Sequence, residues 1–130
     1  MEKVDKVFIS YAHQDQEWVD QFTAELAKKG VNVWLAEKEI AVGESIVDKL
    51  EEALRSSETI VFVLGPESVH SSNLFFELGA ALGMGKRVIA VVNKEVGFAD
   101  LPGPIRLRKY LVMEDPQHTA SELYPLLATG

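Results

Sequence analysis

The sequence predicts a doubly wound α/β fold, in which a five-stranded parallel sheet carries helices on both of its faces. Short runs of β-branched and aromatic residues recur along the chain and alternate with segments of helical spacing. Two of these runs, 7–11 and 59–65, are apolar on both faces, which is typical of central strands in a parallel sheet. The segments between the runs are long enough for crossover helices, so the strands should all point the same way.

The elements follow from this pattern in order. We expect strands over residues 7–11, 31–36, 59–65, 87–92 and 108–113. The first helix should begin at Asp15 as its N-cap and end at Gly30, with Trp18 and Phe22 on its core face. Further helices are predicted over 46–56, 72–84 and 119–127, and Pro125 should bend or shorten the last of them. Residues 93–104 are predicted as a loop because glycine and proline interrupt them.

Composition excludes several classes of function. The 130 residues suffice for one domain with a core, and their net charge of −7 disfavours binding to nucleic acid or to an anionic membrane. Three scattered histidines and no cysteine give no spacing of metal ligands, so we expect no metal site. With no long apolar run and no signal pattern, we expect a soluble, cytoplasmic protein. We also expect residues 1–130 to be the N-terminal domain of a longer protein.

The helix predicted over 72–84 carries the most informative residue. Glu77 is its only charged side chain, and no other charge lies between Glu67 and Lys86. On a helix that is apolar nearly all round, such an acid either reaches solvent at a rim or lines a cavity. An acid early in a helix is also favoured by the helix dipole alone, which would make Glu77 ordinary. Gly79 and Gly83 predict a close approach of other backbone to this helix.

In a doubly wound sheet, ligands bind at the carboxyl ends of the strands. Residues 11–13, 37–43 and 68–73 should all lie at that edge, together with the first turns of the Glu77 helix. The chain has no glycine-rich dinucleotide motif, no P-loop and no nucleophile elbow. Ser10 lacks flanking glycines and is interpreted as structural. One carboxylate at the ligand-binding edge is therefore the main functional signal.

Four blocks of the sequence, taken in order, resemble the Toll/interleukin-1 receptor (TIR) domain family. They are VFISYA, GESIVDKLEEALRSS, TIVFVLGPES and SSNLFFELGAALGMGKRVIAVV. Many members of this family cleave the nicotinamide–ribose bond of NAD, whereas others only assemble signalling complexes. The resemblance implies that Glu77 is the catalytic acid and that a neighbouring copy in an oligomer completes the active site. It also implies an effector role in bacterial antiphage immunity.

The resemblance suggests further site residues. Tyr11 is a candidate wall of the pocket, and His13 is a candidate contact for the pyrophosphate of NAD. Many NAD-cleaving relatives have a tryptophan four residues before the acid, where this chain has Asn73, so the stacking surface should come from Phe76, from its neighbour Phe75 or from Trp34.

A loop over 37–45 is expected to lie at an interface between copies. It presents apolar residues between acids, and its interface residues should be Ile40, Val42 and Gly43. At the end of the second strand many relatives have an aspartate, where this chain has Ala36, so a contact at that point would have to come from Glu37.

The chemistry expected of Glu77 needs no cofactor, because NAD is the substrate. The leaving group is a pyridinium that departs as neutral nicotinamide, so a general acid is unnecessary. The carboxylate can stabilise the positive charge on the ribose, orient its hydroxyls or form a transient ester. Attack by water gives ADP-ribose, and internal attack gives a cyclic product. Two alternatives remain: a non-catalytic TIR scaffold, and a nucleoside deoxyribosyltransferase-like enzyme, whose family also carries a glutamate on a helix after an apolar strand.

Overall fold

The computed structural model describes residues 4–35, 46–70 and 72–128, and it confirms the predicted doubly wound α/β fold. Five strands form one sheet in the order β2-β1-β3-β4-β5, and every neighbouring pair is parallel. The strands are β1 Val4–Ser10, β2 Val31–Leu35, β3 Thr59–Leu64, β4 Arg87–Val92 and β5 Leu111–Val112. The central strand β3 is buried at every position, as its uniformly apolar sequence predicts.

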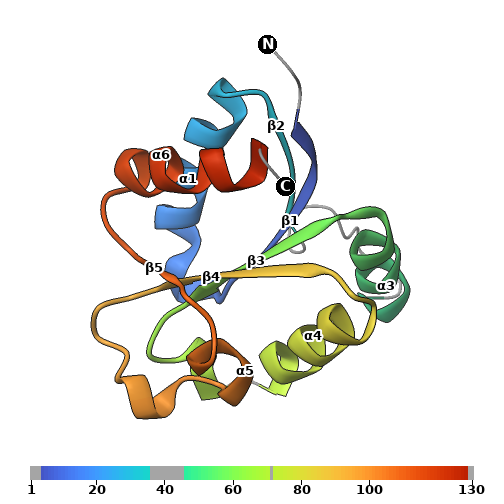
Figure 1. Cartoon of the computed structure of the whole chain (residues 1–130), viewed down its shortest axis with the longest axis vertical. Helices are drawn as coiled ribbons and strands as arrows, with labels where there is room; N and C mark the ends of the chain where they lie inside the picture. The colour runs from blue at the N-terminus through green and yellow to red at the C-terminus, as the bar shows by residue number, and fades with distance from the viewer. Residues whose placement is uncertain (1–3, 36–45, 71, 129–130) are drawn as a thin grey trace.

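Helices cover both faces of the sheet (Figure 1). One layer consists of α1 (Gln16–Lys28) and α6 (Pro116–Ala128), and the other consists of α3 (Ile46–Ser56), α4 (Ser72–Gly83) and α5 (Gly103–Arg106). Each layer encloses its own apolar cluster. Phe22 and Leu123 belong to the cluster beneath α1 and α6, while Phe8, Leu54 and Leu78 belong to the other. None of the helices in the described ranges is long and apolar enough to cross a membrane.

The expectation that backbone lies close to Gly79 and Gly83 is wrong. Both glycines are exposed on α4, and a Cβ atom built on either one would have no atom within 4 Å outside its own helix and chain neighbours. The buried face of α4 is formed instead by Leu74, Leu78 and Ala81. After the helix, Gly85 adopts a left-handed φ of 71°, as predicted for the residue that ends it.

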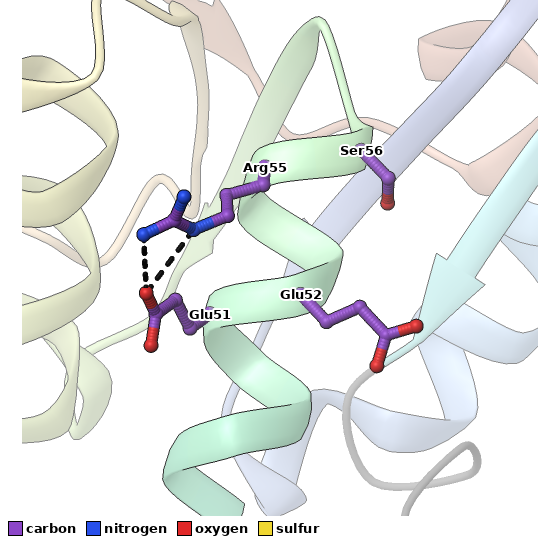
Figure 2. Close-up of a pocket in the computed structure, with 4 residues that line it drawn as sticks. All are labelled: Glu51, Glu52, Arg55 and Ser56. Carbon is purple, nitrogen blue, oxygen red and sulfur yellow. Dashed lines mark hydrogen bonds and ion pairs between the residues drawn. The ribbon is translucent and has the colours of Figure 1, made fainter.

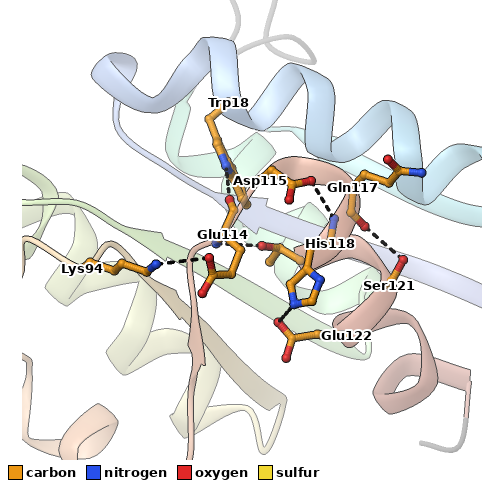
Figure 3. Close-up of polar contacts among 9 residues, drawn as sticks. Trp18, Lys94, Glu114, Asp115, Gln117, His118, Ser121 and Glu122 are labelled. Carbon is orange, nitrogen blue, oxygen red and sulfur yellow. Dashed lines mark hydrogen bonds and ion pairs between the residues drawn. The ribbon is translucent and has the colours of Figure 1, made fainter.

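The terminal helix is longer than predicted. It begins at Pro116, three residues before the expected start, because Asp115 supplies an N-cap: its Oδ1 accepts the His118 N–H at 3.0 Å. Pro125 lies inside the helix and does not shorten it, since α6 continues to Ala128. The junction before α6 is attached to α1 through Trp18, whose Nε1 donates to the Glu114 carbonyl at 2.9 Å (Figure 3).

The segment before β5 also differs from the prediction. The expected loop over 93–104 contains a 3₁₀ turn, Phe98–Asp100, and the start of the short helix α5. Its apolar residues Leu101 and Ile105 are buried against the α3/α4/α5 layer, which explains why the segment is ordered despite its glycines and prolines. The fifth strand is shorter than predicted because only Leu111 and Val112 pair with β4.

Candidate active site

Glu77 lies in the second turn of α4, and its carboxyl group is largely buried although the preceding Phe76 is 55% exposed. Burial raises the pKa of Glu77 to about 7 from its ordinary value of 4.5. A hydrogen bond from the Ser10 side chain partly opposes this rise. Within the described residues, the carboxyl oxygen Oε2 is buried and has no hydrogen-bond partner. The carboxyl group therefore has a vacant acceptor in a poorly solvated place.

Ser10 places this carboxyl group at the carboxyl end of the sheet. It is the last residue of β1, it is buried, and it lies opposite Phe62 of β3 in the register of the two strands. Side chains alternate along a strand, so Ser10 points to the same face as Phe8, which packs in the α3/α4/α5 layer. From the sequence alone, Ser10 is interpreted as a structural residue. Period-two alternation and its place at the strand end are the signals that could have linked it to Glu77.

A pair of carboxylates, Asp15 and Glu67, lies at the same edge of the sheet, and sequence reasoning missed it. Asp15 occupies the predicted N-cap position of α1, but its side chain makes no capping hydrogen bond. Burial raises the pKa of Asp15, and the nearby charge of Glu67 adds to that rise. Gln14 donates from Nε2 to Oε2 of Glu67, which connects the turn after β1 with the turn after β3.

Gly65 leaves room for the Asp15 carboxyl group where these two turns meet. A Cβ atom at this position would lie 2.9 Å from Oδ2 of Asp15, which is closer than real Cβ contacts. The turn itself is held by Ser68, whose Oγ accepts the Gly65 N–H at 2.8 Å and donates to the Gly65 carbonyl at 3.2 Å. The turn after β3 leads directly into the 3₁₀ turn Ser68–His70 and then into α4. Ser68 thus holds the turn that precedes the Glu77 helix, and the Asp15 carboxyl group lies against that turn.

The aromatic candidate Trp34 lies on the same face of the sheet as Ser10. Its ring is partly buried and stacks on Phe8, with ring centroids 5.0 Å apart. The Nζ atom of Lys6 lies 5.9 Å from the centroid of the same ring. Because Phe8 and Trp34 are register partners and Ser10 lies two residues after Phe8, the indole lies next to the strand ends that carry the site.

The other predicted site residues, Tyr11, His13 and Phe76, lie at different positions around the sheet. Tyr11 packs against the cluster beneath α1 and α6, on the sheet face opposite to Glu77. His13 is exposed at the start of the 3₁₀ turn His13–Asp15, at the same edge as Ser10. Phe76 is exposed beside Glu77. The structure therefore brings Ser10 and Glu77 together, places Trp34 on the same face of the sheet, and packs Tyr11 on the other face.

Several predicted residues lie outside what the structure describes. The interface residues Ile40, Val42 and Gly43 fall in the undescribed range 36–45, as do Ala36 and Glu37. Asn73 belongs to α4, one turn before Glu77, but its side chain is not described. Among the described residues, no group of three or more histidine, aspartate or glutamate side chains could hold a metal ion.

This arrangement suits one chemical task. A buried carboxyl group with a vacant oxygen can pair with a group that carries or develops positive charge, because such a partner restores the ionised form that burial disfavours. Glu77 is the one acidic residue of α4.

Comparison with known proteins agrees with the fold. The TIR domain family matches residues 7–124 of the chain. The protein is 35% identical over 72 residues to Toll-like receptor 1 of Homo sapiens, a match that covers 55% of this chain and 9% of the receptor. It is 34% identical over 73 residues to the 2' cyclic ADP-D-ribose synthase AbTIR of Acinetobacter baumannii, covering 55% of this chain and 27% of that protein.

A solved structure shows the same fold. The metazoan TIR-STING receptor of C. gigas, in complex with 2',3'-cGAMP, superimposes with a TM-score of 0.80 and 22% identity, over 96% of this chain and 40% of that one. The chain spans only 9% of the length of Toll-like receptor 1 and 27% of the length of AbTIR.

Proposed function

Because the chain belongs to the TIR domain family, we propose that it is an NAD nucleosidase in which Glu77 promotes cleavage of the nicotinamide–ribose bond. The observation that carries this proposal is the Glu77 carboxyl group itself, with its pKa raised to about 7 and an unpaired, buried Oε2. An acid that served only to complement the helix dipole would be solvated and would need no buried position. The similarity to a bacterial 2' cyclic ADP-D-ribose synthase supports the same chemistry.

The substrate supplies a positively charged partner for this carboxyl group. NAD carries a positive charge on its nicotinamide ring, and that charge passes toward the ribose as the bond breaks. A cation within about 4–6 Å favours ionisation of a carboxyl group. Bound NAD should therefore lower the pKa of Glu77 and convert it to the carboxylate that stabilises the ribose cation. The neutral nicotinamide then leaves without a general acid.

The products, partners and setting form part of the proposal. Water gives ADP-ribose, whereas attack by a hydroxyl or by the adenine of the same molecule gives a cyclic ADP-ribose. We place the activity in the cytoplasm, in an effector domain of bacterial antiphage immunity that acts on NAD without a further cofactor. Activity should require self-association, in which a second copy completes the pocket, and should require neither nucleic acid nor membrane.

The decisive experiment is the substitution Glu77→Gln. The amide is nearly isosteric, so α4 should keep its packing, but it cannot neutralise positive charge on the ribose. We expect nicotinamide release to fall roughly 100- to 1000-fold, as for the loss of other groups that stabilise transition-state charge. Release should be measured by chromatography at a protein concentration at which the wild type is active and assembled.

The matched control is Glu95→Gln, an exposed acid in the loop after β4. It should keep the wild-type rate. A Glu77→Gln protein with the wild-type rate would exclude the catalytic role of Glu77. A wild-type protein that assembles but releases nothing from NAD would favour the scaffold, and release of a base from a deoxynucleoside would favour the deoxyribosyltransferase-like enzyme.

A further inference from the structure

The two carboxyl oxygens of Glu77 have different surroundings. The Ser10 side chain hydrogen-bonds to this carboxyl group. The oxygen Oε2 is buried and has no hydrogen-bond partner among the described residues, so the bond from Ser10 goes to the other oxygen. The carboxyl group is thus held by the protein on one oxygen and open to a ligand on the other.

Ser10 belongs to a well-supported part of the sheet. It is the last residue of β1, which pairs with β2 on one side and with β3 on the other, and its register partner in β3 is Phe62. Its side chain is buried and has a single torsion angle before the hydroxyl oxygen. The carboxyl group of Glu77 lies at the end of a longer, more flexible side chain, so without a partner it could adopt several orientations. A hydroxyl fixed on the sheet can select one of them.

The sequence of α4 turns Glu77 toward this hydroxyl. The buried face of the helix is formed by Leu74, Leu78 and Ala81. Glu77 follows Leu74 by three residues and precedes Ala81 by four, a spacing that places these residues on one side of a helix. A buried hydroxyl costs free energy unless it is hydrogen-bonded, and an apolar residue in place of Ser10 would avoid that cost. The contribution of the Ser10 hydroxyl is therefore its bond to Glu77.

We propose that Ser10 is a positioning residue, whose hydroxyl holds one oxygen of Glu77 so that Oε2 faces the ribose of bound NAD. Ser10 itself does not contact the reacting atoms. Orientation matters because a group that stabilises charge in a transition state is effective only when it is already aimed at the atom that becomes charged. This inference rests on the proposed function and deepens it, since it names the residue that orients the carboxylate.

The first test is the kinetics of Ser10→Ala with NAD, at a protein concentration at which the wild type is active and assembled. We expect kcat to fall about tenfold or more, because the carboxylate is no longer aimed, while KM stays within about twofold. The kcat/KM profile should also move to higher pH, because the lost hydrogen bond favoured the ionised form. The loss in kcat should persist above the titration of Glu77, where ionisation is complete. Ser10→Thr keeps the hydroxyl and should recover most of kcat.

The second test follows the ionisation of Glu77 without NAD. Carbon NMR of glutamate side-chain carboxyl groups reports each titration, and the Glu77 signal is identified as the one that Glu77→Gln removes. Its midpoint should lie at about pH 7 in the wild type and higher in Ser10→Ala. Ser10→Thr should titrate like the wild type. Ser10→Cys keeps the size of the side chain but is a weaker donor, so its midpoint should lie between those of the wild type and Ser10→Ala.

The matched control is Ser57→Ala, which also removes a buried hydroxyl, in this case one without a hydrogen-bond partner among the described residues. It should keep the wild-type kcat and the wild-type titration of Glu77. Circular dichroism should show that each variant is folded. An unchanged Glu77 titration in Ser10→Ala, or a kcat that recovers fully at high pH, would overturn the positioning role. A wild type that titrates as expected but releases no nicotinamide would contradict only the nucleosidase proposal.

Discussion

The carboxyl group of Glu77 is held between its two protonation states at neutral pH. Burial on α4 raises its pKa to about 7, and only the hydrogen bond from Ser10 favours the charged form. The protonation state of such a group changes readily when another charge is placed beside it. The same burial that prepares Glu77 for a cationic substrate should destabilise the empty protein, because ionising a poorly solvated acid costs free energy.

This cost has a defined dependence on pH. The native pKa lies above the ordinary value of 4.5, so the native state binds a proton that the unfolded state has lost between pH 4.5 and about 7. The free energy of unfolding should therefore fall as pH rises through this window. Glu77→Gln removes the effect, so the variant should match the wild type below pH 4.5 and exceed it above pH 7, by up to about 3 kcal/mol.

Urea denaturation at a series of pH values measures this difference, since other titrating groups cancel between the two proteins. Glu95→Gln, an exposed acid, should show no such trend. A Glu77→Gln difference that stays constant with pH would contradict the raised pKa.

At the scale of residues, the sequence identified Glu77 as the candidate catalytic acid, but it did not predict which side chains surround it. Glu77 could be singled out because no other charge interrupts residues 68–85. The role of Ser10 was missed, because a serine at the end of an apolar strand has no motif of its own. Asp15 was placed correctly at the start of α1, but its interaction with Glu67 depends on where two distant turns meet, which local patterns cannot tell.

Among the elements, the turns after β1 and β3 form one unit through Asp15 and Gly65. The absence of a Cβ at Gly65 lets the Asp15 carboxyl group pack against the turn that leads to α4. The effects of substitutions at Asp15 and at Gly65 on stability should therefore be coupled.

Gly65→Ala tests this contact. The added methyl group would lie 2.9 Å from Oδ2 of Asp15, which is the end of a side chain and can shift, so the variant should lose about 1 kcal/mol of stability, the low end of the usual cost of overpacking. The same substitution in an Asp15→Ala background should cost clearly less, because the opposing carboxyl group is gone. A double-mutant cycle by urea denaturation measures the coupling, and additive effects would show that Asp15 does not limit the space at Gly65.

The boundaries of elements were predicted best where packing is strongest. β4 has the predicted bounds, and its last four residues are buried. The terminal helix was predicted too short mainly at its start, because the N-cap Asp115 and the following Pro116 were missed. Pro125 does not end the helix, since packing of Leu123 and Leu127 keeps the helix intact around it. The order in residues 98–106 was missed because burial of Leu101 and Ile105 outweighs their glycine and proline neighbours.

At the scale of the whole molecule, the candidate site lies at the edge of the sheet formed by the carboxyl ends of the strands. The sequence predicted the sheet, its two layers and an edge for the site. It did not predict the surface hollow on α3 that is lined by Glu51, Glu52, Arg55 and Ser56 (Figure 2), because a surface hollow depends on how helices are placed and not on their periodicity.

We expect the NAD-cleaving activity of this protein to depend on its self-association. We expect nicotinamide release per molecule to rise with protein concentration, because a second copy is proposed to complete the pocket. Fusion to an oligomerising domain should raise the activity of dilute protein in the same way. Initial rates across a concentration series measure this, and a constant specific activity in the dilute and the concentrated protein would contradict it.

The two tryptophans lie in different layers of the fold. Trp18 stacks on Phe22 in the α1/α6 layer, and Trp34 stacks on Phe8 in the layer that carries Glu77. Variants with a single indole would give fluorescence that reports on one layer at a time. Coincident melting of both signals would indicate cooperative unfolding. A change confined to Trp34 when a nucleotide is added would locate its binding without any label.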